Sequence, residues 1–363
     1  MNRLRMAVIG VGHLGKEHAR ILAGLPDVEL VGVADLNAEQ ARLVADRCGT
    51  GSFTEFAPLL HRVDAVTVVV PTIYHHAVAK EFLKHKIPVL VEKPIATTVA
   101  EADDLVRLAR ENGVPLQVGH IERFNPAFEE LAHRPMQPKF IESERHGPFT
   151  GRSTDIGVVL DLMIHDLDLL LGLVGSPVIE VEALGSAVFG GHEDVVNARL
   201  TFESGCIAHV TASRVSQHAK RRLRIWAPEG YAGIDFVKKR LVLVKSSDQL
   251  RLHGLHVGPN DTAKKSALKN DVFGKHLHTI ELDCNRGDQL TSELKHFIQC
   301  VRTNAKPRVT GEDGRNALAL AQRILESVRE HRWNGANDSE AVGVHGFPLP
   351  LGELFETAQS EAA

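Results

Sequence analysis

Strand-like and helix-like segments alternate through the first third of the chain, and this alternation constrains the fold more than any other feature. Short, nearly continuous apolar runs rich in β-branched residues are typical of strands buried on both faces. They are Arg5–Gly10, Val28–Ala34, Asp64–Val70, Ile87–Val91 and Pro115–Val118. The segments between them have the spacing of helices: His13–Leu25, Asn37–Arg47, Tyr74–His85 and Thr98–Asn112. The pattern predicts a parallel sheet with helices on both faces.

The second half of the chain has a different pattern, because apolar and polar residues alternate strictly. Val195–Phe202 and Cys206–Ser213 each place small and apolar side chains on one face, and Glu203-Ser204-Gly205 between them suits a hairpin turn. Leu223 and Ile225 continue the alternation between arginines. A period of two predicts an antiparallel sheet with one half-exposed face.

The change of pattern near residues 120–125 divides the chain. We expect an α/β Rossmann domain over 1–122, an α+β domain with an open antiparallel sheet over 123–330, and a tail or arm over 331–363. Within the second domain we expect a long loop at Leu250–Gln289 and helices at Leu290–Thr303 and Asp313–Glu330.

Composition argues against several classes of protein. Lys plus Arg is 42 and Asp plus Glu is 46, so the net charge of −4 disfavours a general nucleic-acid binder. No apolar run approaches the roughly 18 residues of a membrane span, and the first residues lack the pattern of a secretory signal. The four cysteines are scattered, without disulfide or zinc spacing. We therefore expect a cytoplasmic protein without a metal site, and no nucleic acid or membrane as partner.

A GxGxxG motif, Gly10-Val-Gly12-His-Leu-Gly15, follows the first predicted strand and opens the first predicted helix. In that context Gly10 permits a tight turn, Gly12 lets the backbone approach a pyrophosphate, and Gly15 allows close packing of helix on strand. The helix N-terminus offers N–H groups to the phosphates. Asp35 ends the second strand, where a carboxylate suits ribose hydroxyls and repels a 2′-phosphate. The motif predicts NAD as the cofactor, in preference to NADP.

Two further motifs place polar groups in apolar surroundings. Glu92-Lys93-Pro94 lies at the carboxyl end of a predicted buried strand, where ligands bind in open α/β sheets. Lys93 there suits stabilisation of an alkoxide; the alternative is a surface ion pair.

Asp161 and His165 share one face of an apolar helical run, with Asp168 one turn further. Aspartate beside imidazole suits a general base; the alternative is a hydrogen-bonded structural pair.

Together these segments resemble the glucose–fructose oxidoreductase / inositol dehydrogenase / MocA family. The resemblance runs from Met6 to about Val328, and its carriers are AVIGVGHLGKEHAR, Pro71-Thr-Ile-Tyr-His75, VLVEKP, DLMIHDLD and the segment from LKHFIQC to GRNALAL. It implies a Rossmann domain, an open antiparallel sheet that often forms oligomer contacts, and Lys93, Asp161 and His165 beside the nicotinamide. The cofactor contacts that it implies are Gly10, Gly12, His13, Leu14, Gly15, Asp35, Pro71, Thr72, His75, Glu92 and Lys93.

A narrower likeness concerns the segments GHIERFNPAF, from Gly119, and VVLDLMIHD, from Val158. They are similar to the UDP-N-acetylglucosamine 3-dehydrogenases, which act in the route to amino-sugar lipid A precursors. In such an enzyme Arg123, Arg145 and Arg152 are candidate diphosphate clamps, because guanidinium binds phosphate bidentately. The alternative for each is an ordinary ion pair. Asp161 and His165 complete the predicted substrate site.

The resulting hypothesis is NAD-dependent oxidation of a sugar hydroxyl, namely the C3 hydroxyl of UDP-N-acetylglucosamine. In this hypothesis His165 is the base and Lys93 stabilises the alkoxide. Asp161 binds the substrate or orients the hydrogen-bond network. A downstream aminotransferase is a candidate partner, and a homodimer or homotetramer is expected. The alternatives are a dehydrogenase of a free polyol or sugar such as inositol, a glycosidase that uses NAD without net redox turnover, and a dinucleotide-sensing regulator.

Overall fold

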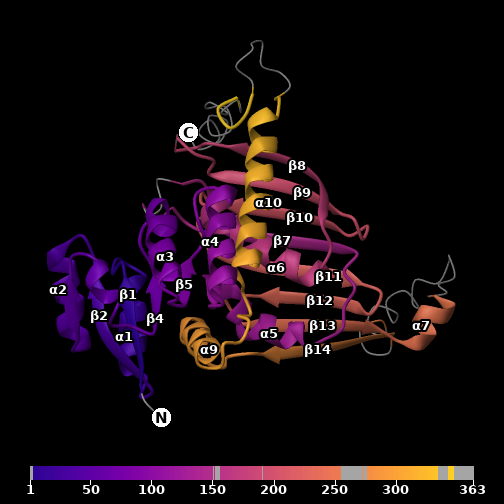
Figure 1. The fold of residues 1–363 in the computed structure, drawn as a ribbon. Helices are drawn as coiled ribbons and strands as arrows, with labels where there is room; N and C mark the ends of the chain where they lie inside the picture. Colours follow the sequence, from indigo (N-terminus) through magenta and orange to yellow (C-terminus); the bar gives the residue numbers. More distant parts are fainter. Residues whose placement is uncertain are drawn as a thin grey trace, which may run out of the picture.

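The protein is described here by a computed structural model of residues 3–149, 151, 156–189, 191–254, 272, 276–333 and 342–346. These residues form two sheets that lie beside one another, with the long helix α10 between them (Figure 1). None of the helices in this described part is long and apolar enough to span a membrane.

The first sheet is parallel throughout and has the strand order β3-β2-β1-β4-β5-β6. This is the order of a Rossmann fold, as expected. Its strands are β1 (Leu4–Ile9), β2 (Val28–Ala34), β3 (Gly51–Phe53), β4 (Ala65–Val68), β5 (Val89–Glu92) and β6 (Leu116–Gly119). Only β3 was not predicted, because three residues are too short for a recognisable pattern.

Helices cover both faces of this sheet. α1 (Gly15–Gly24) and α2 (Ala38–Cys48) pack on one face, and α3 (His75–Lys84) and α4 (Val99–Asn112) pack on the other. Short 3-10 turns, η1 (Ala57–Leu59) and η2 (Thr72–Tyr74), precede α3. α4 begins with the Thr98/Glu101 capping box read from the sequence and ends at Gly113, whose φ of 64° is the left-handed cap that glycine favours.

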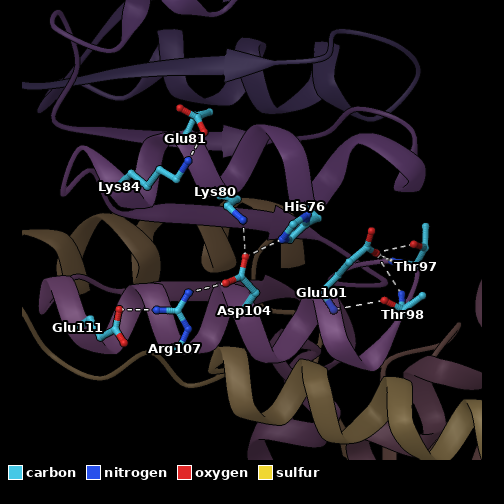
Figure 2. A network of polar contacts seen from close by, with 10 residues as sticks. All are labelled: His76, Lys80, Glu81, Lys84, Thr97, Thr98, Glu101, Asp104, Arg107 and Glu111. Carbon is cyan, nitrogen blue, oxygen red and sulfur yellow. Dashed lines mark hydrogen bonds and ion pairs between the residues drawn. The ribbon is translucent and has the colours of Figure 1, made fainter.

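A polar network joins α3 to α4 at the surface (Figure 2). Asp104 of α4 accepts hydrogen bonds from Lys80 (2.8 Å) and contacts His76 (2.9 Å) of α3, and Arg107 donates to it from within α4 (2.6 Å). Hydrogen bonds from Lys80 and His76 hold the pKa of the Asp104 carboxyl well below its usual range. The network fixes the two helices on this face of the first sheet.

The second sheet has the order β14-β13-β12-β11-β7-β10-β9-β8. It was expected to be antiparallel, and every pair is, except β7 with β10, which run parallel; the sheet is therefore mixed. Its strands are β7 (Phe140–His146), β8 (Val178–Ser186), β9 (Val195–Phe202), β10 (Ile207–Ser213), β11 (Lys220–Ala227), β12 (Gly230–Asp235), β13 (Arg240–Ser246) and β14 (Leu277–Asp283).

One face of the second sheet buries the largest core of the molecule. Its apolar side chains pack against α5 (Pro126–Ala132), a π-helical turn η4 (Val159–Met163), α6 (Ile164–Val174) and α10 (Gly311–Glu330). The opposite face carries cross-strand ion pairs such as Arg222–Asp235 and an aromatic row of Phe140, Trp226 and Tyr231.

Near its C-terminal end the chain returns to the first sheet. The predicted division into one domain over 1–122 and another over 123–330 does not describe this return. α9 (Gln289–Thr303) places Leu290, Leu294 and Phe297 in the core beneath α1, so it completes the Rossmann unit. α10 contacts α4 on one side and β8 on the other. The short turn η3 (Ile121–Phe124) joins the two parts of the chain.

Two expected irregular regions contain ordered structure. The prediction of a loop at 250–289 is wrong at both ends of the segment, where helix α7 (Asp248–His253) and strand β14 form. Residues 255–271 and 273–275 of the segment lie outside the described residues. In the expected tail, Val344 packs on the core of the second sheet and its carbonyl accepts from Ala187 N (3.2 Å).

Candidate active site

A cleft of about 850 Å³ opens at the carboxyl edge of the first sheet, beside the turn between β1 and α1. Residues from three predicted cofactor segments line it together: Gly10, Gly12 and His13, then Asp35 with Leu36, then Val69, Val70, Pro71 and Tyr74. Ligands bind at this edge of open α/β sheets, so the cleft lies where the fold predicts it.

The three glycines of the motif have different surroundings. Gly10 has a φ of 87°, and a Cβ there would lie 2.6 Å from the Val69 carbonyl carbon. A Cβ on Gly15 would collide with the carbonyl of Gly10, so Gly15 permits helix α1 to pack on the turn. Gly12 faces open space, with no atom within 4 Å of such a Cβ. The first and third glycines therefore build the turn, and the second leaves room for a ligand.

Asp35 is held firmly in this cleft at the end of β2. Its Oδ2 accepts from Val11 N (2.9 Å) and its Oδ1 from Asn37 N (2.9 Å). Two backbone donors fix the carboxylate between the glycine turn and the start of α2. The exposed neighbour Leu36 brings no positive charge to which a 2′-phosphate would bind.

Leu14, Thr72 and His75, also predicted to contact the cofactor, are not among the residues that line the cleft. His75 is 1% exposed, and its two ring nitrogens lie 2.8 Å from the carbonyl oxygens of Pro94 and Val70. The side chain thus ties the turn after β5 to the loop after β4. His75 positions the backbone around the cleft, and the prediction of a direct cofactor contact is not supported by its place.

Lys93 follows β5 and reaches across to the second part of the chain. Its Nζ donates to the backbone carbonyl of Asp161 (2.7 Å) and to Asp161 Oδ1 (3.1 Å). Asp161 lies in the π-helical turn η4, and such turns are frequent at functional sites because they alter the regular hydrogen bonding of a helix. The ion pair that Lys93 forms with Asp161 is partly buried, since the side chains are 18% and 28% exposed.

Glu193 holds this turn in place. Its Oε1 accepts from Val159 N (3.1 Å), and its carboxylate occupies the space where any side chain at Gly157 would lie. Burial raises the pKa of this carboxyl. Gly157 therefore allows a buried acid to cap the helix that carries Asp161 and His165.

His165 lies in the first turn of α6, close to Lys93. Its Nδ1 is buried and has no hydrogen-bond partner in the described part of the chain. Burial, reinforced by the nearby charges of Lys93 and Arg145, holds the pKa of His165 well below its usual value. The imidazole is consequently neutral at neutral pH. The carboxylate of Asp161 pairs with Lys93 instead of orienting this ring.

His120 and Glu122 also lie in this cluster, although neither is among the residues predicted for the site. His120 directly follows β6, at the same sheet edge as Lys93, and its ring meets that of His165 edge-on with centroids 6.1 Å apart. It is 1% exposed, and burial lowers its pKa. Glu122 is 4% exposed and accepts from Arg145. Their position immediately after a buried strand is the signal that would have identified them.

The predicted diphosphate clamps have other roles. Arg145 is 2% exposed and donates to Asp166 (2.8 and 2.9 Å) and to Glu122 (2.8 Å), so its guanidinium is enclosed by carboxylates. Arg123 donates to both oxygens of the buried Asp168 (2.7 and 2.9 Å). The clamp prediction is corrected for both, since both form internal ion pairs. Arg152 lies outside the described residues.

Glu92 also turns inward, away from the predicted cofactor contact. It is 8% exposed, and its Oε1 lies 3.2 Å from His18 Nε2 of α1. Among the described residues no group of three or more His, Cys, Asp or Glu side chains is arranged to hold a metal ion.

Comparison with known families agrees with this geometry. Residues 4–120 match the model described as "Oxidoreductase family, NAD-binding Rossmann fold", and residues 131–232 match the GFO/IDH/MocA C-terminal domain. The chain belongs to the GFO/IDH/MocA family. It is therefore an oxidoreductase that uses NAD, and the cleft fits that cofactor, because Gly12 leaves space beside the α1 N-terminus and Asp35 is fixed at the adjacent strand end.

Individual relatives give the same result in more detail. The chain is 35% identical to the UDP-N-acetylglucosamine 3-dehydrogenase of Acidithiobacillus ferrooxidans over 329 residues, covering 90% of this chain and 98% of that protein. A solved structure of that enzyme superposes with a TM-score of 0.80 at 34% identity, over 90% and 98% of the two chains. The myo-inositol 2-dehydrogenase of Thermotoga maritima is 26% identical, over 91% and 97%.

Proposed function

We propose that this oxidoreductase oxidises the C3 hydroxyl of UDP-N-acetylglucosamine to the 3-keto sugar nucleotide. The observation that carries the chemistry is the placement of Lys93, fixed by Asp161, beside the neutral, partly buried imidazole of His165. NAD, when bound, accepts the hydride from the carbon that bears the hydroxyl.

The contacts of Lys93 suit an alkoxide stabiliser. An ammonium group has three N–H donors, and two of them are directed at Asp161. One donor is left for a substrate oxygen. Because the side chain is held at both contacts and is 18% exposed, this donor is oriented before the substrate arrives.

His165 suits the base that removes the hydroxyl proton. A general base must be unprotonated before the reaction, and burial with the surrounding cations keeps this imidazole neutral. Proton removal by His165 and hydrogen bonding by Lys93 then act on the same oxygen atom. His120, packed edge-on against His165, limits the positions that the base can take.

The relatives support the sugar nucleotide as substrate. The Acidithiobacillus enzyme is named for UDP-N-acetylglucosamine and shares 35% identity with this chain, whereas the Thermotoga inositol dehydrogenase shares 26%. A free polyol such as inositol is therefore the second candidate. A 3-keto product is a substrate for an aminotransferase, which would continue toward an amino sugar of the kind found in lipid A precursors.

The second sheet supports assembly of copies of the chain. Its face opposite α6 presents the row of Phe140, Trp226 and Tyr231, with ring centroids 5.1 and 5.2 Å apart. Partly exposed aromatic side chains are enriched in protein interfaces. We expect a homodimer or homotetramer through this face, which sedimentation of the wild-type protein and a Trp226→Arg variant would test.

The central experiment follows NADH absorbance with UDP-N-acetylglucosamine and NAD at near-stoichiometric enzyme, because a tightly held NADH would hide turnover. We expect a rise that falls about 10²- to 10⁴-fold in rate in a His165→Ala variant, with NAD affinity unchanged. Equal rates in the two proteins would remove His165 from the mechanism. Oxidation of inositol but not of UDP-N-acetylglucosamine would establish the second candidate. Release of sugar without NADH would contradict both.

A further inference from the structure

Arg221 is the second residue of strand β11 and lies on the side of the second sheet that packs against α6. In the antiparallel pair of β11 with β7 it lies opposite Arg145, and directly opposite residues point to the same face of a sheet. Arg145 on that face contacts Asp166 of α6, the helix that carries His165. The positive charge of Arg221 is among those that lower the pKa of His165.

Arg221 is less tightly paired than Arg145 and Arg123, which both donate hydrogen bonds to buried carboxylates. Its one ion-pair contact joins Nη1 to Glu122 Oε1 at 3.7 Å, beyond hydrogen-bond distance, and that oxygen already accepts from Arg145 at 2.8 Å. The guanidinium makes no hydrogen bond to any residue that the structure describes, and the side chain is 47% exposed. A partly exposed cation without a hydrogen bond to the described residues therefore lies on the same face of the sheet as Arg145, near His165.

These properties match one kind of ligand. A guanidinium presents its N–H groups in a planar fork that fits two oxygens of a phosphate. Arg145 and Arg123 are already paired with Asp166, Glu122 and Asp168, and their side chains are only 2% and 14% exposed, so they are less accessible to an anionic ligand than Arg221. At Arg221, an anionic group entering beside His165 would compete with the long contact to Glu122.

We propose that Arg221 binds the diphosphate of the substrate and so selects a sugar nucleotide over a free sugar. This inference rests on the proposed function, since the diphosphate is the anionic group that distinguishes UDP-N-acetylglucosamine from inositol. Arg221 is a specificity-determining residue, because it contacts the substrate away from the carbon that is oxidised.

The next residue in the chain supplies a matched control. Arg222 is 41% exposed and points to the opposite face of the sheet, where its Nε lies 3.6 Å from Asp235 Oδ2. Arg221→Gln and Arg222→Gln therefore remove the same charge from the same strand at similar exposure. Only the first change removes it from the catalytic side.

The test is calorimetric titration of the NADH-loaded wild-type protein and of both variants, with UDP-N-acetylglucosamine and with UDP alone. Loss of a charged hydrogen-bonded contact is expected to weaken both ligands about 10- to 100-fold in Arg221→Gln. Arg222→Gln should bind both within twofold of the wild type. In steady-state assays Arg221→Gln should raise KM by a similar factor and leave kcat within about threefold, since the contact is made equally in the ground and transition states.

Three results would overturn the inference: unchanged affinity in Arg221→Gln, an equal loss in both variants, or a loss for UDP-N-acetylglucosamine with none for UDP, because the contact would then be to the sugar. The proposed function fails separately. If the wild type binds UDP through Arg221 but produces no NADH from UDP-N-acetylglucosamine, the diphosphate site stands and the oxidised sugar is a different one.

Discussion

The two halves of the candidate active site are built from different parts of the polypeptide. The cofactor cleft is shaped mainly by backbone: the Gly10 turn, the open space at Gly12 and the two amides that hold Asp35. The catalytic half is built from side chains that meet across long stretches of sequence, such as Lys93 with Asp161 and Arg145 with Glu122. A backbone site depends on local conformation, whereas a side-chain site depends on which charges are already paired.

The largest effect on stability is expected in the catalytic half, from Arg145→Met. The substitution leaves Asp166 and Glu122 buried with unbalanced charge, so the free energy of unfolding should fall by about 3–5 kcal/mol. Urea denaturation of the variant measures the loss. Arg222→Met, on the exposed face, should change the same quantity by less than about 0.5 kcal/mol. A loss below about 1 kcal/mol in Arg145→Met would show that the buried cluster is not electrostatically required.

The corresponding change in the cofactor half is Gly10→Ala, compared with Gly12→Ala. The new methyl group at position 10 meets the Val69 carbonyl at a φ of 87°, so we expect a loss of about 2–3 kcal/mol in the free energy of unfolding. At position 12 the methyl group enters open space, and stability should remain the same while NAD affinity falls. Thermal unfolding with and without NAD separates these effects. Equal stability losses would contradict the assignment of a structural role to Gly10 and of a ligand-binding role to Gly12.

Cofactor preference is the next test, because the Asp35 carboxylate lies in the cofactor cleft at the end of strand β2. Asp35→Ala removes a carboxylate fixed by Val11 and Asn37 and with it the repulsion of a 2′-phosphate. The ratio of kcat/KM for NAD over NADP should fall about tenfold, which corresponds to about 1.4 kcal/mol. An unaltered ratio would assign the preference to another part of the cleft.

The smallest effect is expected at the surface network between α3 and α4 (Figure 2). Asp104→Asn should lower the free energy of unfolding by about 0.5–1 kcal/mol at pH 7. Because the pKa of Asp104 is lowered in the fold, its stabilisation is present above the pKa of an unfolded aspartate, about 3.9, and is lost as the pH falls below it. Urea midpoints of wild type and variant should therefore converge in acid. A constant difference down to pH 3 would show that charge is not the cause.

The sequence alone determined the parts of the molecule whose signals are local. The Rossmann strands and helices, the α4 capping box and the glycine turn all follow from residues close together in the chain, because propensity, capping and φ requirements act over a few positions. The prediction of Lys93 and His165 as site residues rests on a related signal, since each is a polar group in an apolar segment. β14 was missed because four successive residues in it are exposed and no alternation marks it.

Tertiary structure decided the features that depend on contacts between residues far apart in the chain. It enclosed Arg145 between the carboxylates of Asp166 and Glu122 and paired Arg123 with Asp168. It also left Arg221 without a hydrogen bond to any described residue and returned α9 to the first sheet. It also paired β7 with β10 in parallel and brought the Asp161 carbonyl to Lys93. The sequence around an arginine does not distinguish one that binds substrate from one that binds a buried aspartate. Only the position of its partner, which comes from packing between segments far apart in the chain, separates the two roles.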